Sequence, residues 1–483
     1  MNNMKNTYYT IIPQLIIGLI CLLIFDSCSF TDDIHTSEEY YYQNELFTRG
    51  LSDENKDSFE LKDSLQLCII TEEMIPKIAD CILRNNGLSG DYALTAVSEE
   101  NKTLLYIINY STGGWAIISG IVHNSNYIMA LSTEGSFNIN KIESPEVSYW
   151  INSLEQRIRQ LYSQYENKIA TRDQFSFDDE PYVWVRLTLD PEYSSQLYST
   201  VGPYLSTKWG QSTPWNYLCP IDDGERCPLG CTTVAFSQML YYLHYQIGLP
   251  DGLYHQIDTN YTWNSGGYYT SSVIRSNYTS PSARWNNMQL ILTFSLTPKV
   301  IFVGDFMMDI ADRLGTQFKK GDGSAAFTRS VFNNIGIGCF LTNFNYNIVK
   351  NSLDNSMPVL LSADDHYSDA AHTWVVDGYK TQEIRTDNPY KWVIMPPDSL
   401  AYYNNINYDY VLTESQKQYL YPDVYENQII HNYSYSYTNQ LYMNWGWNGS
   451  WNGYYSISPN NWDPDVFLFS DDVQMIYGFY DAT

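Results

Sequence analysis

The stretch from Cys227 to Tyr245, CPLGCTTVAFSQMLYYLHY, places the strongest constraint on the fold. After a turn-like Pro-Leu-Gly approach, its apolar residues recur three or four positions apart, at Ala235, Phe236, Met239, Leu240 and Leu243. This spacing predicts a helix that presents one face to a core, with Cys231 in its first turn. Free backbone N–H groups and the helix dipole at that position favour a thiolate, the nucleophilic form of cysteine. Cys231 is therefore a candidate nucleophile, with a buried packing residue as the alternative.

The size and charge of the chain bound the possible functions. At 483 residues the chain is too long for one ordinary core, so two or three domains are expected. A hydrophobic content of 44%, with 44 tyrosines and 13 tryptophans, is typical of a folded, aromatic-rich protein. The 27 basic residues against 54 acidic ones give a net charge of −27. No nucleic-acid partner is expected, because neutralising phosphates requires the opposite sign of charge.

Residues 1–27 have the layout of a lipoprotein-type signal peptide. Lys5 precedes an apolar run, Ile11 to Phe25, that is shorter than a bilayer-spanning helix requires. The run leads to Ser27-Cys28, which resembles the lipobox of bacterial lipoproteins, although Phe25 and Asp26 depart from the usual residues. We expect Cys28 to be lipidated, with an uncleaved anchor or a plain secretory signal as the alternatives.

Residues 28–57 are polar and acidic and have no apolar period, which predicts a flexible tether. Within them, Asp32 and Asp33 resemble the export signal that sends some Gram-negative lipoproteins to the outer cell surface. The expected location is therefore extracellular, at the bacterial outer-membrane surface. The outer membrane would be a partner through the lipid anchor.

Residues 58–185 are predicted to form a small α+β domain. Two β-rich runs within Thr103–Gly120 flank a Ser-Thr-Gly-Gly turn, which is a strong hairpin signal. A third strand is expected over Tyr127–Ser132, and helical spacing marks Glu146–Tyr165. The acidic, less periodic stretch that follows predicts a junction, and residues 186–483 form the second domain.

A cysteine nucleophile also needs a donor for the developing oxyanion. Gln211 lies in a loop rich in Gly, Pro and Asn, Ser206–Pro220, and its side-chain amide can supply one N–H group. The backbone N–H of Cys231, at the start of the helix, can supply another. A solvated loop glutamine is the alternative for Gln211.

The base of a thiolate mechanism is expected to be His372. Of the seven histidines, it is the one directly before a β-type run, Thr373 to Val376, which we expect to end at the turn residues Asp377 and Gly378. A sheet holds an imidazole at that position while leaving it facing a cleft. Its separation from Cys231 along the chain is within the range of papain-like proteases. A structural histidine at the end of a strand is the alternative.

An imidazolium beside a thiolate needs an orienting acceptor, and the segment Leu441–Ile457 offers one. This segment alternates strand residues with Asn-Gly turns, and Asn444-Trp445 heads its glycine-rich part. A side-chain amide oxygen can accept the ring N–H, and the neighbouring indole of Trp445 can shield that hydrogen bond from water. The alternative is a pair of strands with aromatic packing.

Together these motifs resemble the streptopain family of papain-like cysteine peptidases. The resemblance covers most of the chain from about residue 60, and five motifs occur in the family's order. The amino-terminal stretches GWAIISG and ALSTEGSF resemble the family's inhibitory prodomain. The other matches are Trp209 to Asn216, Cys219-Pro220, Gly230-Cys231 with Ala235, Gln238 and Met239, His372 with Trp374 to Gly378, and Asn444 to Trp447 with Gly453 to Tyr455.

The resemblance implies a papain-like α+β fold and a role for each residue. Cys231 would attack a peptide carbonyl, and His372 would act first as base and then as acid. Gln211 would line the oxyanion hole, while Asn444, supported by Trp445, would hold the imidazole. The amino-terminal domain would be a propeptide that inhibits its own chain until cleavage between about Tyr165 and Ser206, and the other partners would be protein or peptide substrates.

The sequence departs from the family pattern in three places. Ala371 stands where glycine often precedes the histidine, and Thr232-Thr233 replaces Val-Ala after the nucleophile. A long segment also separates His372 from Asn444, and residues 381–440 are expected to form an inserted lobe. Such a lobe would serve as a lid or a recognition surface, or it would mark a relative that has lost catalysis.

The remaining cysteines do not have the spacing of a metal site. Cys219, Cys227 and Cys231 contain no CxxC pair and no histidine at ligand spacing, so neither a metal nor another cofactor is expected. In an exported protein, Cys219 and Cys227 could instead form a disulfide.

The sequence therefore predicts a secreted or surface-tethered cysteine endopeptidase that is made as a zymogen. Two other classes stay open. One is a catalytically silent adhesin or glycan-binding lipoprotein, which the richness in Tyr, Trp and Asn would suit. The other is an acyl transferase that uses the same Cys-His-Asn site with an acceptor other than water.

Overall fold

The computed structural model describes residues 68–123, 126–170, 181–189, 192–248, 253–293, 295–364, 371–387, 389–397, 408–457 and 471–482. All of them belong to one compact unit, Leu65–Thr483. The predicted signal peptide, Cys28 and the tether lie outside the described residues. Within the described part of the chain, no helix has both the length and the apolar character needed to cross a bilayer.

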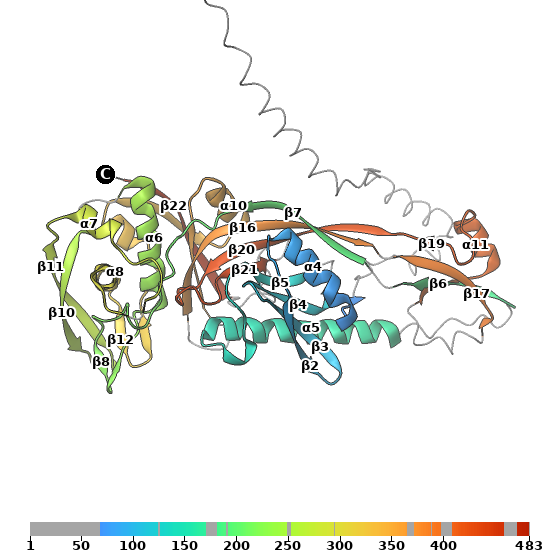
Figure 1. Ribbon diagram of the computed structural model, residues 1–483, viewed down its shortest axis with the longest axis horizontal. Coiled ribbons are helices and arrows are strands. Elements are labelled where there is room, and N and C mark those ends of the chain that lie inside the picture. The colour runs from blue at the N-terminus through green and yellow to red at the C-terminus, as the bar shows by residue number, and fades with distance from the viewer. Residues whose placement is uncertain are drawn as a thin grey trace, which may run out of the picture. The chain divides into compact units, whose positions relative to one another are not determined.

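The amino-terminal part is an antiparallel sheet with a helix on each face (Figure 1). Strands β2 (Tyr92–Glu99), β3 (Lys102–Tyr110), β4 (Trp115–His123) and β5 (Asn126–Ser132) pair in that order, and β1 (Cys68–Ile69) pairs with β4. Helix α4 (Ile75–Asn85) covers one face with its isoleucines, and α5 (Pro145–Ala170) covers the other. The structure therefore confirms the hairpin around residues 111–114, the third strand and the long helix.

The second domain has a helical part around α6 (Cys231–Ile247) and α8 (Pro298–Leu314). A four-stranded sheet flanks it, made of β10 (His255–Trp263), β11 (Tyr269–Asn277), β12 (Gln317–Lys319) and β13 (Asp322–Ser324). The predicted helix at Cys231 is confirmed, but it is buried on nearly all sides and not along one face. The reason is that α6 packs against both α8 and the strand β16 (Ala371–Asp387).

The shorter elements complete this domain. They are the hairpin β8 (Ile221–Asp222) and β9 (Glu225–Arg226), and the helices α7 (Pro281–Asn286), α9 (Ser330–Asn333) and α10 (Tyr346–Asp354). The amino-terminal domain also contains two single turns, η1 (Glu72–Met74) and η2 (Ile139–Lys141).

One antiparallel sheet joins the two domains. Its order is β14 (Ile337–Asn343), β22 (Asp471–Asp481), β15 (Val359–Asp364), β16, β20 (Tyr433–Asn444), β21 (Gly453–Ile457), β5, β4, β3 and β2, with β7 (Glu192–Val201) beside β16. The junction is the pairing of β21 with β5, in register at Tyr454 with Leu131 and Tyr455 with Ala130. Residues of both domains therefore share one apolar core.

Strand β16 is longer than the sequence predicts. Asp377 and Gly378 do not end it as a turn: the strand continues to Asp387, with an irregularity in its pairing with β20 between Val376 and Gly378. A Cβ on Gly378 would lie 2.7 Å from the carbonyl oxygen of Val201, so the close approach of β7 requires glycine there. The expected turn was wrong because glycine serves here to admit a neighbouring backbone.

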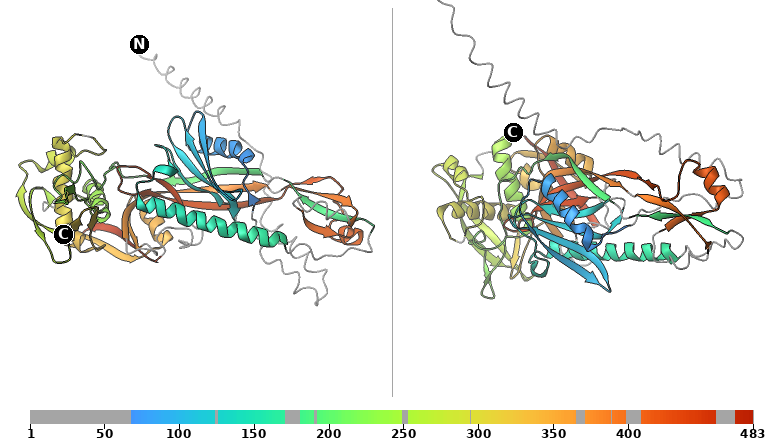
Figure 2. Two further views of the ribbon diagram at one scale, coloured as in Figure 1. Left: turned by 90° about the horizontal axis from the view of Figure 1, so that it is seen from below. Right: turned by 45° about the vertical axis from the view of Figure 1, so that its right-hand side comes forward.

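Beyond this point β16 and β20 run on as a pair into a small lobe, which we call the distal lobe (Figures 1 and 2). It contains a sheet in the order β18 (Tyr408–Leu412), β6 (Val183–Thr188), β17 (Tyr390–Met395) and β19 (Ile429–Ile430), with helix α11 (Glu414–Leu420). The predicted insertion, 381–440, begins inside β16 and ends inside β20. The predicted domain boundary at residue 185 falls inside β6, an inner strand of the distal lobe.

Candidate active site

A tight backbone contact places Cys231 as the first residue of α6. Gly230 has φ 86°, and a Cβ there would lie only 1.7 Å from the carbonyl oxygen of Gly323. Only glycine fits this approach, so the chain turns sharply and the helix starts at the cysteine. The side chain of Cys231 is partly exposed, at the helix end where unsatisfied N–H groups favour an anion.

The residues on either side of His372 contact the start of α6. Cys231 Sγ lies 3.9 Å from the carbonyl oxygen of Ala371, and the hydroxyls of Thr232 and Thr373 are 3.1 Å apart. Strand β15 holds this end of β16 in register, with Ala363 opposite His372. The predicted nucleophile and the predicted base therefore lie on adjoining segments, although they are far apart in the sequence.

Two indoles surround the imidazole of His372. Its ring stacks on Trp374 at 5.9 Å and 13°, and lies 6.0 Å from the ring of Trp445. Successive side chains of a strand alternate, so His372 and Trp374 share one face of β16 while Thr373 faces α6. That face belongs to the core shared with the amino-terminal domain, and His372 is accordingly only 2% exposed.

Asn444 is held by a buried network of amide hydrogen bonds. Its Oδ1 accepts from Gln238 Nε2 at 3.3 Å and from the N–H of Gly446 at 3.4 Å, and its Nδ2 donates to Thr207 O at 3.1 Å. Gln238 Oε1 in turn accepts from the N–H of Trp209 at 3.3 Å. The amide of Asn444 thus ties β20 to α6 and to the loop before it.

The sequence analysis assigned no role to Gln238, although a signal was present. It follows Cys231 by seven residues, which is about two helical turns and puts both on one side of α6. A buried glutamine side chain needs partners for its amide, and Asn444 and Trp209 supply them.

The loop that carries Gln211 packs against the approach to Cys231. The carbonyl oxygen of Gln211 accepts from the N–H of Leu229 at 2.9 Å, two residues before the cysteine, and Gln211 is buried. The loop also contacts the glycine-rich segment, through a bridge between Gly210 and Trp447. The structure therefore gathers the segments of the predicted catalytic residues around the start of α6.

Asp377 is a site-supporting residue that the sequence analysis treated as part of a turn. It is fully buried, its Oδ2 accepts from the N–H of Leu205 at 2.7 Å, and its carbonyl oxygen accepts from Tyr204 at 3.0 Å. Burial raises the pKa of this carboxyl to about 7, against the opposing effect of the backbone N–H groups. Asp377 fixes the segment that ends at Thr207, the partner of Asn444.

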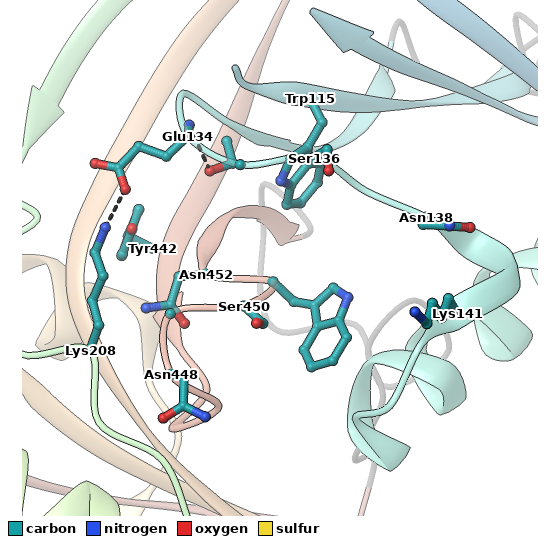
Figure 3. A pocket seen from close by; sticks show the side chains of 14 residues that line it. Trp115, Glu134, Ser136, Asn138, Lys141, Lys208, Tyr442, Asn448, Ser450 and Asn452 are labelled. Atoms are coloured by element: carbon teal, nitrogen blue, oxygen red, sulfur yellow. Dashed lines mark hydrogen bonds and ion pairs between the residues drawn. The ribbon is translucent and has the colours of Figure 1, made fainter. Parts of the chain in front are cut away.

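A cavity of about 410 Å³ lies between the two domains (Figure 3). The amino-terminal domain contributes Trp115 and the loop around Glu134, and the second domain contributes Lys208, Tyr442 and the turn 448–452. Lys208 forms an ion pair with Glu134 across the boundary. Cys231 and His372 are not among the lining residues, so this cavity is a feature of the domain interface and not the site of the thiol.

The neighbouring cysteines are thiols. Cys219 and Cys227 are both buried and neither is in a disulfide, and burial raises the pKa of each thiol. In the described part of the chain, no three His, Cys, Asp or Glu side chains gather in a way that would hold a metal ion.

Comparison with known families decides how this arrangement is classified. Residues 209–393 match the Peptidase C10 family, and residues 75–158 match the Spi protease inhibitor family. The second domain therefore contains a segment that is similar to the C10 family. The predicted resemblance to streptopain-type peptidases, the inhibitor-like amino-terminal domain and the α+β fold class are confirmed.

The chain also has similar sequences among curated proteins. Streptopain of Streptococcus pyogenes, and that of its serotype M1, are each 25% identical over 239 residues, or 47% of this chain and 53% of theirs. The chain thus spans about half the length of the curated relatives it matches. Among solved structures, Prevotella intermedia prointerpain A is similar with a TM-score of 0.46 and 18% identity, over 81% of this chain and 99% of that one. Active interpain A of the same organism is similar with a TM-score of 0.37 and 19% identity, over 59% of this chain and 96% of that one.

Proposed function

We propose that this chain is a cysteine endopeptidase made as a zymogen. In the proposed reaction, the thiolate of Cys231 attacks a peptide carbonyl carbon to form a tetrahedral oxyanion. His372 takes the thiol proton and returns it to the amine as the C–N bond breaks and the acyl-enzyme forms. Water, deprotonated by His372, then releases the carboxylic acid and restores the thiol.

One observation carries the proposal. In a segment similar to the C10 family, the thiol at the first residue of α6 lies 3.9 Å from the carbonyl of Ala371, the residue directly before the histidine. The dipole of α6 would favour the thiolate, and the backbone N–H of Cys231 with the amide of Gln211 would stabilise the oxyanion.

Asn444 and Trp445 would orient the imidazole. In the structure the Oδ1 of Asn444 already accepts from Gln238 and Gly446. An orienting bond to His372 would therefore replace or share one of these bonds when the site becomes active. The indole of Trp445 would shield it from water.

The amino-terminal domain would keep the enzyme latent as a propeptide and intramolecular inhibitor. Its strand β5 extends the sheet of the second domain, and its Trp150 packs 5.2 Å from Tyr455. Tyr455 contacts Trp445 at 5.4 Å, which in turn lies against His372. A continuous set of rings thus links the propeptide-like domain to the imidazole, and release of that domain would uncover the face of β16 on which His372 lies.

The cellular location belongs to the proposal as well. Secretion would follow from the leader at residues 1–27, and lipid attachment at Cys28 would tether the enzyme to the outer-membrane surface. Mass spectrometry of the protein from its native membrane would show a diacylglycerol-modified Cys28 if this is right. An unmodified mature terminus elsewhere would exclude the anchor.

Hydrolysis of a quenched-fluorescent peptide of about eight residues by the processed protein tests the proposed function. Cys231→Ala should abolish cleavage, whereas Cys339→Ala, which removes a buried thiol of β14 in the second domain, should leave it unchanged. A processed wild type that neither cleaves nor reacts with an epoxysuccinyl probe would favour the adhesin. Cysteine-dependent transfer of the acyl group to an added amine, without hydrolysis, would favour the transferase.

A further inference from the structure

The far half of strand β20 carries a row of exposed tyrosines. Tyr433, Tyr435 and Tyr437 alternate along the strand, so all three point to one face, and they are 42%, 60% and 47% exposed. Tyr198 of β7 joins them, with its ring 5.6 Å from that of Tyr437. We call these four residues the tyrosine face. Soluble proteins rarely leave such a set of large rings in water unless the surface binds something.

Charged side chains run beside the tyrosines on the same face. Opposite Tyr437, Tyr435 and Tyr433, strand β16 places Glu383, Arg385 and Asp387. Glu383 accepts a 2.7 Å hydrogen bond from the hydroxyl of Tyr437, and the guanidinium of Arg385 lies 4.0 Å from the ring centre of Tyr433. The carboxylate of Asp387 is buried and bound to His431. The face therefore offers ring surfaces and the carboxylate of Glu383, in a chain whose net charge is −27. This combination favours cationic side chains, which bind over tyrosine rings and pair with carboxylates.

The outer edge of β20 identifies the class of ligand. Among the described strands, β20 pairs with β21 from Asn439 to Met443, whereas from Tyr433 to Tyr437 its partner is β16 alone. That stretch, YSYSY, has regular register with β16 and none of the lysines, prolines or bulges that usually protect an edge. The edge of β7 differs, because its register shifts at Tyr198. A regular strand edge is matched by the backbone of another polypeptide and not by a glycan.

We propose that the tyrosine face and the edge of β20 bind an extended, lysine- or arginine-containing segment of the polypeptide substrate. A strand added to this edge repeats its side chains with the period of the tyrosines, about 6.6 Å, so every second side chain lies beside a ring. This inference rests on the proposed peptidase function and adds a second substrate contact to it.

The same two strands connect this surface to the candidate active site. His372 and Arg385 are both on β16, thirteen residues apart, which is about 43 Å along an extended strand. A substrate engaging both places would need roughly twelve or more extended residues between the scissile bond and the bound segment. The surface therefore selects long, basic, unfolded polypeptides and has no effect on short peptides.

Binding to the full chain carrying Cys231→Ala tests the surface without any proteolysis, since the tyrosines are exposed with the propeptide-like domain in place. The probe is a fluorescein-labelled 20-residue peptide with lysine at every second position, measured by anisotropy. Tyr435→Ser should raise the Kd about fivefold and the triple change of Tyr433, Tyr435 and Tyr437 to Ser more than tenfold. Tyr425→Ser is the matched control, because Tyr425 is 71% exposed in the distal lobe but lies outside the tyrosine face.

The kinetic arm compares an eight-residue peptide with a 30-residue basic peptide cleaved by the processed enzyme. Tyr435→Ser should raise KM about fivefold for the long substrate only, with kcat unchanged. Equal affinity of the binding probe for Tyr435→Ser and the unsubstituted surface would overturn the inference. Equal affinity of the unsubstituted protein for the lysine probe and for a probe with glutamate in place of lysine would also overturn it. A third contrary result would be binding of maltohexaose that depends on the tyrosines, with no binding of the peptide. Failure of the wild type to cleave the short peptide would instead refute the peptidase function.

Discussion

The two ends of strand β16 belong to one hydrogen-bonded ladder but lie in opposite surroundings. At the near end, His372 is 2% exposed and stacks on Trp374 beside Trp445. At the far end, Arg385 lies opposite Tyr435, which is 60% exposed. The difference arises from what packs on the sheet: α6 and the shared core cover the near end, whereas β7 and β20 flank the far end. A single strand can therefore hold a protected chemical group and present a binding surface.

The largest expected effect concerns the near end alone. His372→Ala should lower kcat/KM for a short peptide by at least about a thousandfold, because the general base is lost. Binding of the lysine-rich probe at the far end should not change. The paired measurement is peptide hydrolysis with anisotropy, and His431→Ala serves as the control, since that histidine pairs with Asp387 near the tyrosine face. Loss of hydrolysis in His431→Ala instead of His372→Ala would reverse the assignment.

A second variant, Trp392→Ala, is expected to destabilise the distal lobe at the far end of β16 without changing the candidate active site at the near end. Trp392 is fully buried among Trp184, Leu412 and Tyr421 in the distal lobe. Trp392→Ala should destabilise that lobe by about 3–5 kcal/mol through the cavity it leaves. Amide hydrogen exchange should then quicken in β6, β17 and β18 but not in α6, with short-peptide hydrolysis intact. Equal acceleration in α6 would show that the two regions unfold as one unit.

Gln238→Leu tests the link between α6 and Asn444. The substitution leaves the buried amide of Asn444 and the N–H of Trp209 without this partner, which should cost about 2 kcal/mol of stability. The kcat for short peptides should fall as well, because Asn444 loses its fixed orientation. Urea unfolding and kinetics check both effects. Gln418→Leu, an exposed glutamine of α11, is the control and should change neither quantity.

The smallest effect concerns pH and the docking of the propeptide-like domain. Lys380 is buried, donates to Asn86 Oδ1 at 2.6 Å and lies 4.3 Å from the ring of Tyr454, and burial lowers its pKa to about 8. The docked state then binds fewer protons than the released state between pH 8 and the usual lysine range, so docking should tighten as pH rises through that window. Below pH 8 the lysine is protonated in both states and contributes no slope.

Removal of the charge should remove this slope. The difference in urea midpoint between the wild type and Lys380→Met should grow in favour of the wild type from pH 8 to pH 10. Other titrating groups act on both proteins alike and cancel in this difference. Lys350→Met is the control, because its ammonium pairs with Asp354 at the surface. An unchanged slope in Lys380→Met would exclude Lys380 as its source.

The comparison also separates what the sequence could predict from what it could not. Helical spacing placed Cys231 at a helix start, and the glycine-containing turn at 111–114 identified a hairpin, because both signals are local. The pairing of β5 with β21 and the position of β6 in the distal lobe depend on partners far along the chain, and no local pattern encodes them. The turn predicted at Gly378 was wrong for a related reason, because the residue that requires glycine there, Val201, comes from β7.

The sequence motifs identified part of the candidate site. Motif order brought forward Cys231, His372, Gln211 and Asn444, and the structure places their segments together. Motif order assigned no role at the site to Gln238 or Asp377, because their importance comes from buried hydrogen bonds to distant backbone and side-chain groups.

The most direct test of the account is site-resolved labelling of the processed protein by an epoxysuccinyl probe, read out by peptide mass spectrometry. One modified residue is expected, Cys231, with labelling lost in Cys231→Ala and strongly slowed in His372→Ala, while the buried thiols of Cys219, Cys227 and Cys339 stay unmodified. Rapid labelling of Cys231 that is indifferent to His372 would contradict the central pairing, as would preferential labelling of any other cysteine.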